Sequence, residues 1–457
     1  MPSWLIAAAG LCAAAVAGSA LVRDIPLGLA FVAGCAFLSL VFLSLPLALV
    51  VWVPIAWNEF SHVTDKAPLA GLMLLFVAWI GTRRIRGAIV APELTVRIAR
   101  IAFVLLLVWL TLSISWASDR ADAWAETKGW YLAGVVFLLI TTIATTSRRV
   151  RLIALAFIAG ALLSIVIGLT GSGLSTTANA IDLATRQRFA GGAGDPNYLA
   201  AGLIAAIALA VGLMASARDA LAKLGLATTI LALAAAMAAT GSRGGIIAAL
   251  CAFAAALVLA RERRAETAAF GVLAIASVMC FLLLSTPAGL DRVTTFDAGG
   301  TGRTDLWRVA TRMVGDHPIV GVGVRGFEHE SKAYVLQPGK LTFVKYIADR
   351  PAVTHNIYLQ QLAETGVVGL LLLLVVCLSC LAASQIAAGR FRAGGDRPMA
   401  ALATAATVAM IAMLVASFFI SNGTDKRMWI ALALGPALLT AAGPLLRRPA
   451  HLDSTER

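Results

Sequence analysis

The stretch Thr354–Leu371 reads THNIYLQQLAETGVVGLL and joins two very different parts of the chain. Before it lies the polar segment Pro287–Thr354, and after it the sequence becomes a long hydrophobic run. His355, Asn356 and Tyr358 stand at the junction and are followed by a short amphipathic turn. Polar side chains at the mouth of a membrane span are costly to place there and often mark a functional site. We therefore treat the rest of the chain as a scaffold that brings partners to this junction.

The composition indicates a membrane protein. Of 457 residues, 60% are hydrophobic and 13% are charged, and the mean hydropathy is +0.87. Soluble domains contain roughly 45–50% apolar and about 25% charged residues. The chain also repeats apolar runs that are long enough to cross a hydrocarbon core as helices. These features predict an all-α polytopic membrane protein.

Apolar runs predict about 12 to 14 spans. The run 27–57 carries Pro46 and is too long for one simple crossing, so it forms one tilted helix or two short ones. We divide the chain into N-terminal membrane helices (1–285), a long polar loop (286–356), and C-terminal membrane helices with a short tail (357–457). The expected spans are 4–21, 27–57, 67–82, 101–116, 129–146, 150–170, 196–215, 222–240, 244–261, 266–285, 367–384, 399–420 and 428–446.

The net charge of +13 reflects membrane topology rather than nucleic-acid binding. Basic residues recur in every second loop, which the positive-inside rule assigns to the cytoplasm. The side of the N-terminus stays open. By alternation, the loops 171–195, 240–245, 286–356 and 421–427 face outward, which in a bacterial inner membrane means the periplasm. The basic loops are 83–100, 148–151, 261–264, 390–397 and 447–448.

Three arginines share the outward face with His355. Arg188 lies in RQRFAGGAGDPNYLA (186–200), and Arg243 lies in the tight turn TGSRGG (240–245). Arg303 opens GRTDLWRVATRMVG (302–315), whose apolar spacing predicts a helix. One arginine at a helix end ordinarily reaches lipid phosphates, and one histidine is often structural. Several arginines that converge on a histidine would instead indicate a site.

Such a group suits the departure of a diphosphate. Guanidinium groups bind phosphates bidentately and stabilise the charge that develops on a leaving group. A neutral imidazole accepts a proton from an attacking hydroxyl, and nearby positive charge keeps it neutral. The outward loops contain no DxD, HExxH or Walker motif and no carboxylate cluster, and Asp195 and Asp305 are isolated. We therefore expect no metal and no cofactor. Arg308 and Arg312 lie four residues apart and are interpreted as a solvated helix face.

The motifs together resemble the O-antigen ligase/O-antigen polymerase superfamily of bacterial envelope glycosyltransferases. The residues that carry the resemblance are RFAGGAGDPNYLA (188–200), TGSRGG (240–245), GRTDLWRVATRMVGDHPIVGVGVRGF (302–327) and HNIYLQQLAETGVVGL (355–370). They cover the second half of the chain. The first third matches only in being hydrophobic.

The resemblance implies a GT-C-like membrane fold and a role in lipopolysaccharide biosynthesis. A ligase of this kind moves a glycan from undecaprenyl diphosphate to a sugar hydroxyl of lipid A–core on the periplasmic face, with inversion and without a metal. The implied roles are general base for His355 and diphosphate binding for Arg243, Arg303 and, more weakly, Arg188. Supporting roles are expected for Asn356, Tyr358, Asp195 and Asn197. Besides donor and acceptor, the expected partners are membrane lipids.

Other functions stay open. Within the superfamily, an O-antigen polymerase or a protein O-oligosaccharyltransferase fits the same motifs. The ligase is favoured because only one long outer loop is evident, whereas polymerases often carry two. A transporter or flippase of lipid-linked or anionic solutes fits the number of helices, but the spans are almost free of charge and no internal repeat is visible. A non-enzymatic envelope scaffold leaves the outward arginines unexplained. The glycan, the acceptor sugar and the oligomeric state are not encoded in any motif that we find.

Overall fold

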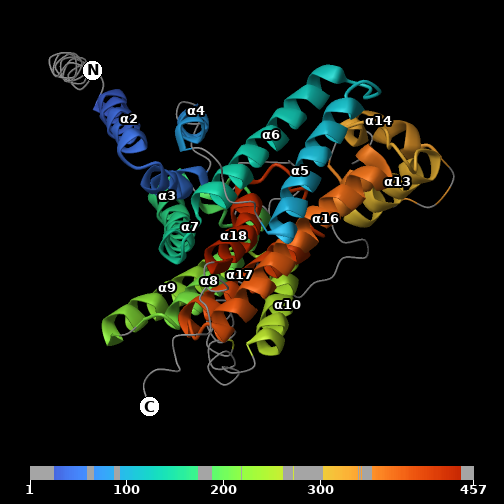
Figure 1. Cartoon of the computed structure of the whole chain (residues 1–457). Helices are drawn as coiled ribbons and strands as arrows, with labels where there is room; N and C mark the ends of the chain where they lie inside the picture. The colour runs from blue at the N-terminus through green and yellow to red at the C-terminus, as the bar shows by residue number, and fades with distance from the viewer. Residues whose placement is uncertain are drawn as a thin grey trace. The chain divides into compact units, whose positions relative to one another are not determined.

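The computed structural model describes residues 25–58, 66–86, 93–172, 188–217, 219–260, 271, 302–337, 339, 341 and 353–443 (Figure 1). Within these residues the chain is helical and contains no β-strand, which confirms the all-α fold class. The expected span 4–21, and 266–285 apart from Gly271, lie outside the described residues. Contacts divide the chain into two compact units, Met1–Trp52 with Ser61–Ile89, and Val53–Phe60 with Val90–Arg457.

The first unit contains α2 (Ile25–Leu43), most of α3 (Leu45–Ala56) and α4 (Lys66–Arg86). The run 27–57 is therefore two helices that separate at Ser44. Pro46 explains the break, because its ring nitrogen has no proton to donate to the preceding turn. Within the unit, the indole of Trp52 donates to the carbonyl of Pro68 at 2.8 Å, which joins α3 to the start of α4.

The second unit is a helical bundle that carries two further helices from the polar loop, α13 and α14. Its longest helix, α16, has 37 residues and a kink, and its α17 and α18 are buried along most of their length. The elements are α5 (Leu94–Ser113), α6 (Arg120–Ile143), α7 (Ser147–Ile167), η1 (Gly168–Ser172), η3 (Gly191–Ala193), α8 (Pro196–Met214), α9 (Ala220–Ala239), α10 (Arg243–Leu259), α13 (Arg303–Asp316), α14 (Gly326–Val335), α16 (Ile357–Ala393), α17 (Arg397–Ala416) and α18 (Lys426–Ala442).

Small residues let the central helices approach closely. A Cβ on Gly435 of α18 would lie 2.2 Å from the carbonyl oxygen of Cys380 in α16, and one on Gly212 of α8 would lie 2.4 Å from Ala405 in α17. Both distances are far below van der Waals contact. Lipid tails are as apolar as leucine, so dispersion contacts of this kind, rather than hydrophobic burial, hold membrane helices together.

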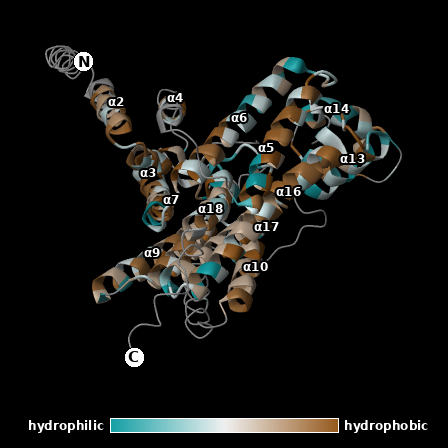
Figure 2. Ribbon diagram, viewed as in Figure 1, coloured by the Kyte–Doolittle hydropathy of each residue, from teal (hydrophilic) through white to brown (hydrophobic). Residues whose placement is uncertain are grey.

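Six described helices are long and apolar enough to span a membrane: Leu94–Ser113, Ser147–Thr170, Pro196–Met214, Ala220–Ala239, Ile357–Ala393 and Arg397–Ala416. Shorter apolar helices add to them, including α10. Figure 2 shows hydrophobic residues along the bundle and hydrophilic ones at the start of α6 and on α13. On α5, the side chains of Val104, Leu105 and Val108 are exposed, as expected of a surface that faces lipid. The chain is a multi-pass membrane protein.

The bundle has two chemically different ends. Helices α8, α10, α16 and α18 begin at one end, where Ile357 donates its backbone N–H to Ser417 and Ile420, and Tyr198 donates to the carbonyl of Ser421. We call this the site end. At the opposite end, Arg390 pairs with Glu93 at 2.9 Å. The other basic residues described there are Arg97, Arg100, Arg148, Arg149, Arg151, Arg392 and Arg397.

The polar loop is anchored in the kink of α16. Gly366 adopts φ 68° and ψ −171°, and a Cβ there would lie 2.0 Å from the carbonyl oxygen of Ile319. The kink leaves carbonyls of α16 without helical partners, and the loop supplies the donors. Val322 donates to Ala363 at 3.0 Å, and Gly323 donates to Glu364 at 2.8 Å. The glycine-rich turn that follows α13 is therefore a docking element, and it fixes α13 and α14 against the site end.

The predicted helix 302–315 is confirmed as α13. Its expected apolar face is buried against α14 and α16, together with Phe327 and Ala363. The interpretation of Arg312 as part of a solvated face is wrong, because its guanidinium donates to the carbonyl of Tyr334 near the end of α14 at 2.7 Å. A cation at a helix C-terminus satisfies a carbonyl that has no partner within the helix. Arg308 is exposed and pairs with Asp305 at 3.3 Å.

Candidate functional site

His355 occupies a constrained position directly before α16. Its backbone has φ 51°, in the left-handed region that few non-glycine residues adopt. Thr354 is buried, and its carbonyl accepts the indole N–H of Trp307 from α13 at 3.1 Å. On the other side, Asn356 caps α16 by accepting the N–H groups of Tyr358 and Leu359. The histidine is thus fixed between the polar loop and the first turn of α16.

The surroundings of His355 keep its ring neutral. Burial and the guanidinium of Arg303 lower the pKa of His355 to about 4, against an opposing effect of the Asp195 carboxylate. Both charged groups come from other parts of the chain, α13 and the start of α8. Of the residues selected from the sequence, Arg303 and Asp195 therefore have their charged groups within electrostatic range of His355.

Arg188 belongs to a second group at the site end. Its Nε donates to the carbonyl of Thr240 at 2.7 Å, and its Nη2 donates to Oδ1 of Asn197 at 2.9 Å. The hydroxyl of Ser242 donates to the same Oδ1 at 2.9 Å. These bonds join the segment before α8 to the turn between α9 and α10. The guanidinium of Arg188 is consequently oriented by groups that lie 9 to 52 residues away in sequence.

Arg243 is the first residue of α10. Ser242 caps this helix by accepting the N–H of Gly245, and Gly244 packs against Phe419 of the loop after α17. A helix N-terminus carries a partial positive charge, which adds to the charge of the arginine. Ser242 connects Arg243 to the Arg188–Asn197 pair, so two of the three arginines lie in one group. Both side chains are partly buried.

The supporting residues divide by role. Asp195 caps α8, where it accepts the N–H groups of Asn197 and Tyr198, and it also acts on His355. Asn197 orients Arg188. By contrast, Asn356 is a helix cap, and Tyr358 binds α17 by donating to the carbonyl of Leu414 at 2.7 Å. The contacts of Asn356 and Tyr358 are those of structural residues.

Residues 421–427 are among the loops expected to face outward, but the sequence did not single out Arg427, which lies in the first turn of α18. Arg427 is 3% exposed and pairs with Asp425 at 2.8 Å. Its guanidinium lies 5.4 Å from the ring centre of Trp57 and 5.8 Å from that of Tyr198. A buried arginine between two aromatic rings would be expensive without its carboxylate partner. The pair fixes this loop beneath the start of α8.

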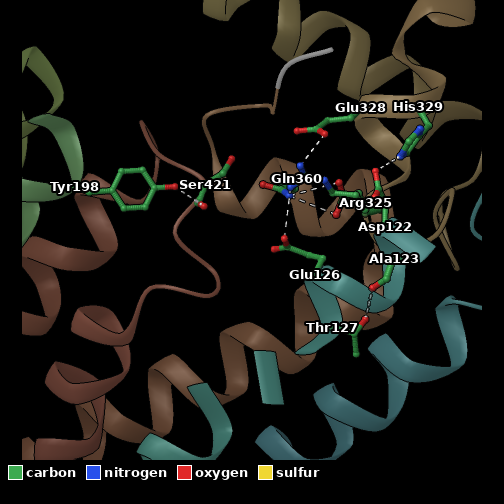
Figure 3. A network of polar contacts seen from close by, with 11 residues as sticks. Asp122, Ala123, Glu126, Thr127, Tyr198, Arg325, Glu328, His329, Gln360 and Ser421 are labelled. Atoms are coloured by element: carbon green, nitrogen blue, oxygen red, sulfur yellow. Dashed lines mark hydrogen bonds and ion pairs between the residues drawn. The ribbon is translucent and has the colours of Figure 1, made fainter. Parts of the chain in front are cut away.

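The expectation that the polar loops hold no carboxylate cluster is wrong. Arg325 pairs with Glu328 at 2.9 Å and with Glu126 of α6 at 3.4 Å (Figure 3). Beside them, the amide nitrogen of Gln360 donates to the carboxylate of Glu364 at 3.4 Å. We call these five residues the carboxylate cluster. No short motif encodes it, because its members come from three helices, α6, α14 and α16, and from the turn before α14.

One group among the described residues has the spacing of a metal site. The ligand atoms of Asp119, Asp122 and His329 lie within 4.8 Å of one another. Asp119 already caps α6, and Asp122 contacts Nε2 of His329 at 3.1 Å. Asp122 is exposed, and exposed acidic groups of this kind also occur without an ion. The group explains how α14 contacts the first turn of α6.

Taken together, the site end offers a neutral imidazole beside one guanidinium, and two further guanidiniums at the turn between α9 and α10. Such an arrangement can bind a polyanion and accept a proton nearby. The guanidinium of Arg188 is held by a backbone carbonyl and a short side chain, which keeps it oriented before a ligand binds.

Comparison with known proteins places this region in a family. Residues 227–374 match the family model described as O-Antigen ligase. The match contains Arg243, Arg303 and His355, while Arg188 precedes it. A search of the curated proteins gives no match. The region that carries the histidine and two of the three arginines is therefore the part of the chain that is similar to the O-antigen ligase/polymerase superfamily.

Proposed function

We propose that this protein is an O-antigen ligase that transfers a glycan from undecaprenyl diphosphate to a sugar hydroxyl of lipid A–core. The reaction would take place at the periplasmic face of a bacterial inner membrane. The observation that carries the proposal is the position of His355, partly buried and acted on by Arg303 and Asp195, within the matched region. The location of the basic residues at the opposite end supports this orientation, since such residues favour the cytoplasm.

In the proposed reaction, the acceptor hydroxyl attacks the anomeric carbon of the donor glycan and a new glycosidic bond forms. The bond between that carbon and the diphosphate oxygen breaks, so undecaprenyl diphosphate leaves with the electron pair. His355 accepts the hydroxyl proton and later releases it to water. Arg303, Arg243 and Arg188 bind the diphosphate and stabilise the charge that it gains. Attack from the side opposite the leaving group inverts the anomeric centre.

The low pKa of His355 fits a base that becomes active only when the donor is bound. In the free site, Arg303 and burial keep the ring neutral but also make it a weak base. A bound diphosphate offsets the charge of Arg303, which raises the pKa of the histidine towards the working pH. General bases are most effective when their pKa lies near that pH.

Analysis of lipopolysaccharide in cells tests the proposal. Cells that lack this chain receive either the wild-type protein or the His355→Ala variant, with expression and membrane insertion checked for both. The proposal predicts that His355→Ala abolishes long O-antigen on lipid A–core and that lipid-linked polymer accumulates. Core that carries a single repeat unit would identify a polymerase instead. An unchanged ladder would show that the histidine is structural.

A further inference from the structure

The carboxylate cluster contains a buried acceptor that nothing in the described structure satisfies. Gln360 is 5% exposed, and its amide nitrogen faces the carboxylate of Glu364. That orientation turns the carbonyl oxygen Oε1 of Gln360 away from Glu364, and this oxygen has no hydrogen-bond partner. An unsatisfied buried acceptor costs about 1–3 kcal/mol. A ligand that donates a hydrogen bond to Oε1 would recover this energy.

Glu126 provides a second acceptor in the same place. The side chain of Glu126 is 22% exposed, whereas Glu364 is 1% exposed. Of these two glutamates, Glu126 is therefore the one that a ligand can reach. Its Oε2 is directed to Arg325 at 3.4 Å. Figure 3 shows Tyr198 and Ser421 on one side of the cluster. Glu126 and Gln360 therefore lie close to the proposed site.

The position of Gln360 along α16 also connects the cluster to His355. Asn356, Gln360 and Glu364 are spaced four residues apart, so they form a polar stripe on one face of the helix. All three are buried. With a rise of 1.5 Å per residue, Gln360 lies about 4.5 Å along the axis from Ile357, the first residue of α16, which follows His355 by two residues. A ligand on this stripe would place a neighbouring group beside the histidine.

The composition of the cluster disfavours the diphosphate as its ligand. Glu126 and Glu328 both pair with Arg325, the one cation among the five members. A diphosphate would be repelled, and its oxygens could not donate to Gln360. A sugar hydroxyl has no charge and donates readily to amide and carboxylate oxygens.

From these observations we infer that Gln360 and Glu126 form the acceptor subsite, in which the amide oxygen and the carboxylate bind hydroxyl groups of the acceptor sugar. The inference rests on the proposed function and assigns a binding site to its second substrate, the acceptor sugar. In this arrangement the donor diphosphate lies on the arginines, and the acceptor sugar lies on Gln360 and Glu126.

The test measures binding of each substrate separately, with the full-length protein in lipid nanodiscs. The probes are core oligosaccharide freed of lipid A, and undecaprenyl diphosphate. Gln360→Met and Glu126→Gln should each raise the Kd for the oligosaccharide at least tenfold and leave the Kd for undecaprenyl diphosphate unchanged.

Two matched variants separate binding from folding. Gln361→Met changes the adjacent buried glutamine, whose carbonyl is already satisfied by Thr365 at 3.0 Å. Glu328→Gln removes the other and closer partner of Arg325. Neither should alter oligosaccharide binding. Equal weakening by these controls, no weakening by Gln360→Met, or no binding to the wild-type protein would overturn the inference.

The same binding data distinguish this inference from the proposed function. If the wild-type protein binds the oligosaccharide through Gln360 but transfers no glycan, the acceptor subsite stands and the ligase reaction falls. If it transfers glycan and Gln360→Met binds the oligosaccharide normally, the reaction stands and the subsite falls.

Discussion

The arginine side and the carboxylate side of the site end differ in charge and in how the chain builds them. Arg188, Arg243 and Arg303 stand at the starts of helices or directly before one, and short polar contacts orient Arg188. The carboxylate cluster instead joins α6 to α14 and α16, and it depends on a kink at Gly366. One side is suited to a polyanion, and the other to neutral hydroxyl groups. Two substrates of unlike charge can thus be kept apart near a single histidine.

Arg303→Ala gives the largest expected effect, because Arg303 is proposed to bind the donor and its guanidinium lowers the pKa of His355. Arg303→Ala should lower the transfer rate about 10²–10³-fold, as loss of one charge-stabilising donor does elsewhere. It should also raise the pKa of His355, since the guanidinium is one of the causes that lower it. The acid limb of kcat/KM, near pH 4 in the wild-type protein, should therefore move to higher pH. The measurement is a pH profile of glycan transfer. Arg303→Lys is the control, because it keeps the positive charge and should leave the acid limb near its wild-type pH. A lower transfer rate with an acid limb at the wild-type pH would show that Arg303 does not influence the pKa of His355.

Gly366 tests whether the carboxylate side depends on the kink. A side chain at φ 68°, ψ −171° is strained, and the Cβ of Gly366→Ala would overlap the carbonyl of Ile319. Strain of this kind costs about 1–3 kcal/mol before the overlap is added. We expect a clear loss of thermal stability and a polar loop that proteases cleave more readily.

Gly389→Ala provides the matched control, because Gly389 lies on the same helix and a Cβ there has nothing within 4 Å. Alanine is a better helix former than glycine by about 0.5–1 kcal/mol, so this variant should be as stable as the wild type or more so. Equal melting temperatures for the two variants would mean that the loop does not depend on the kink.

Asn197 gives the smallest expected effect and tests the arginine side alone. Asn197→Ala removes the 2.9 Å bond that orients Arg188 and should weaken donor binding about tenfold, the usual value of a hydrogen bond to a charged group. The double variant with Arg188→Ala should be no weaker than Arg188→Ala by itself. Additive losses in titrations with undecaprenyl diphosphate would show that the two residues act independently. Acceptor binding should be unchanged in all three.

The contrast between the two sides also explains what the sequence could predict. Hydropathy and the spacing of α13 were sufficient for the fold class and for this helix, because local periodicity determines which face is buried. The arginines and His355 could be selected as candidates because each stands in a short motif before or at a predicted helix. The carboxylate cluster was missed because Glu126 and Arg325 are 199 residues apart. Arg312 was misread for a similar reason, since its partner, Tyr334, lies on another helix.

The role of His355 as the base is tested most directly by the rate of glycan transfer by the purified His355→Ala variant at saturating donor. The affinity of this variant for undecaprenyl diphosphate is measured in parallel. If His355 is the general base, the rate should be about 10²–10⁴-fold below the wild type, which is the usual contribution of such a base. The donor affinity should be unchanged, because the arginines remain. A rate close to that of the wild type would contradict the role of His355 as the base. A loss of donor affinity that accounts for the whole decrease would place the histidine in binding rather than in proton transfer.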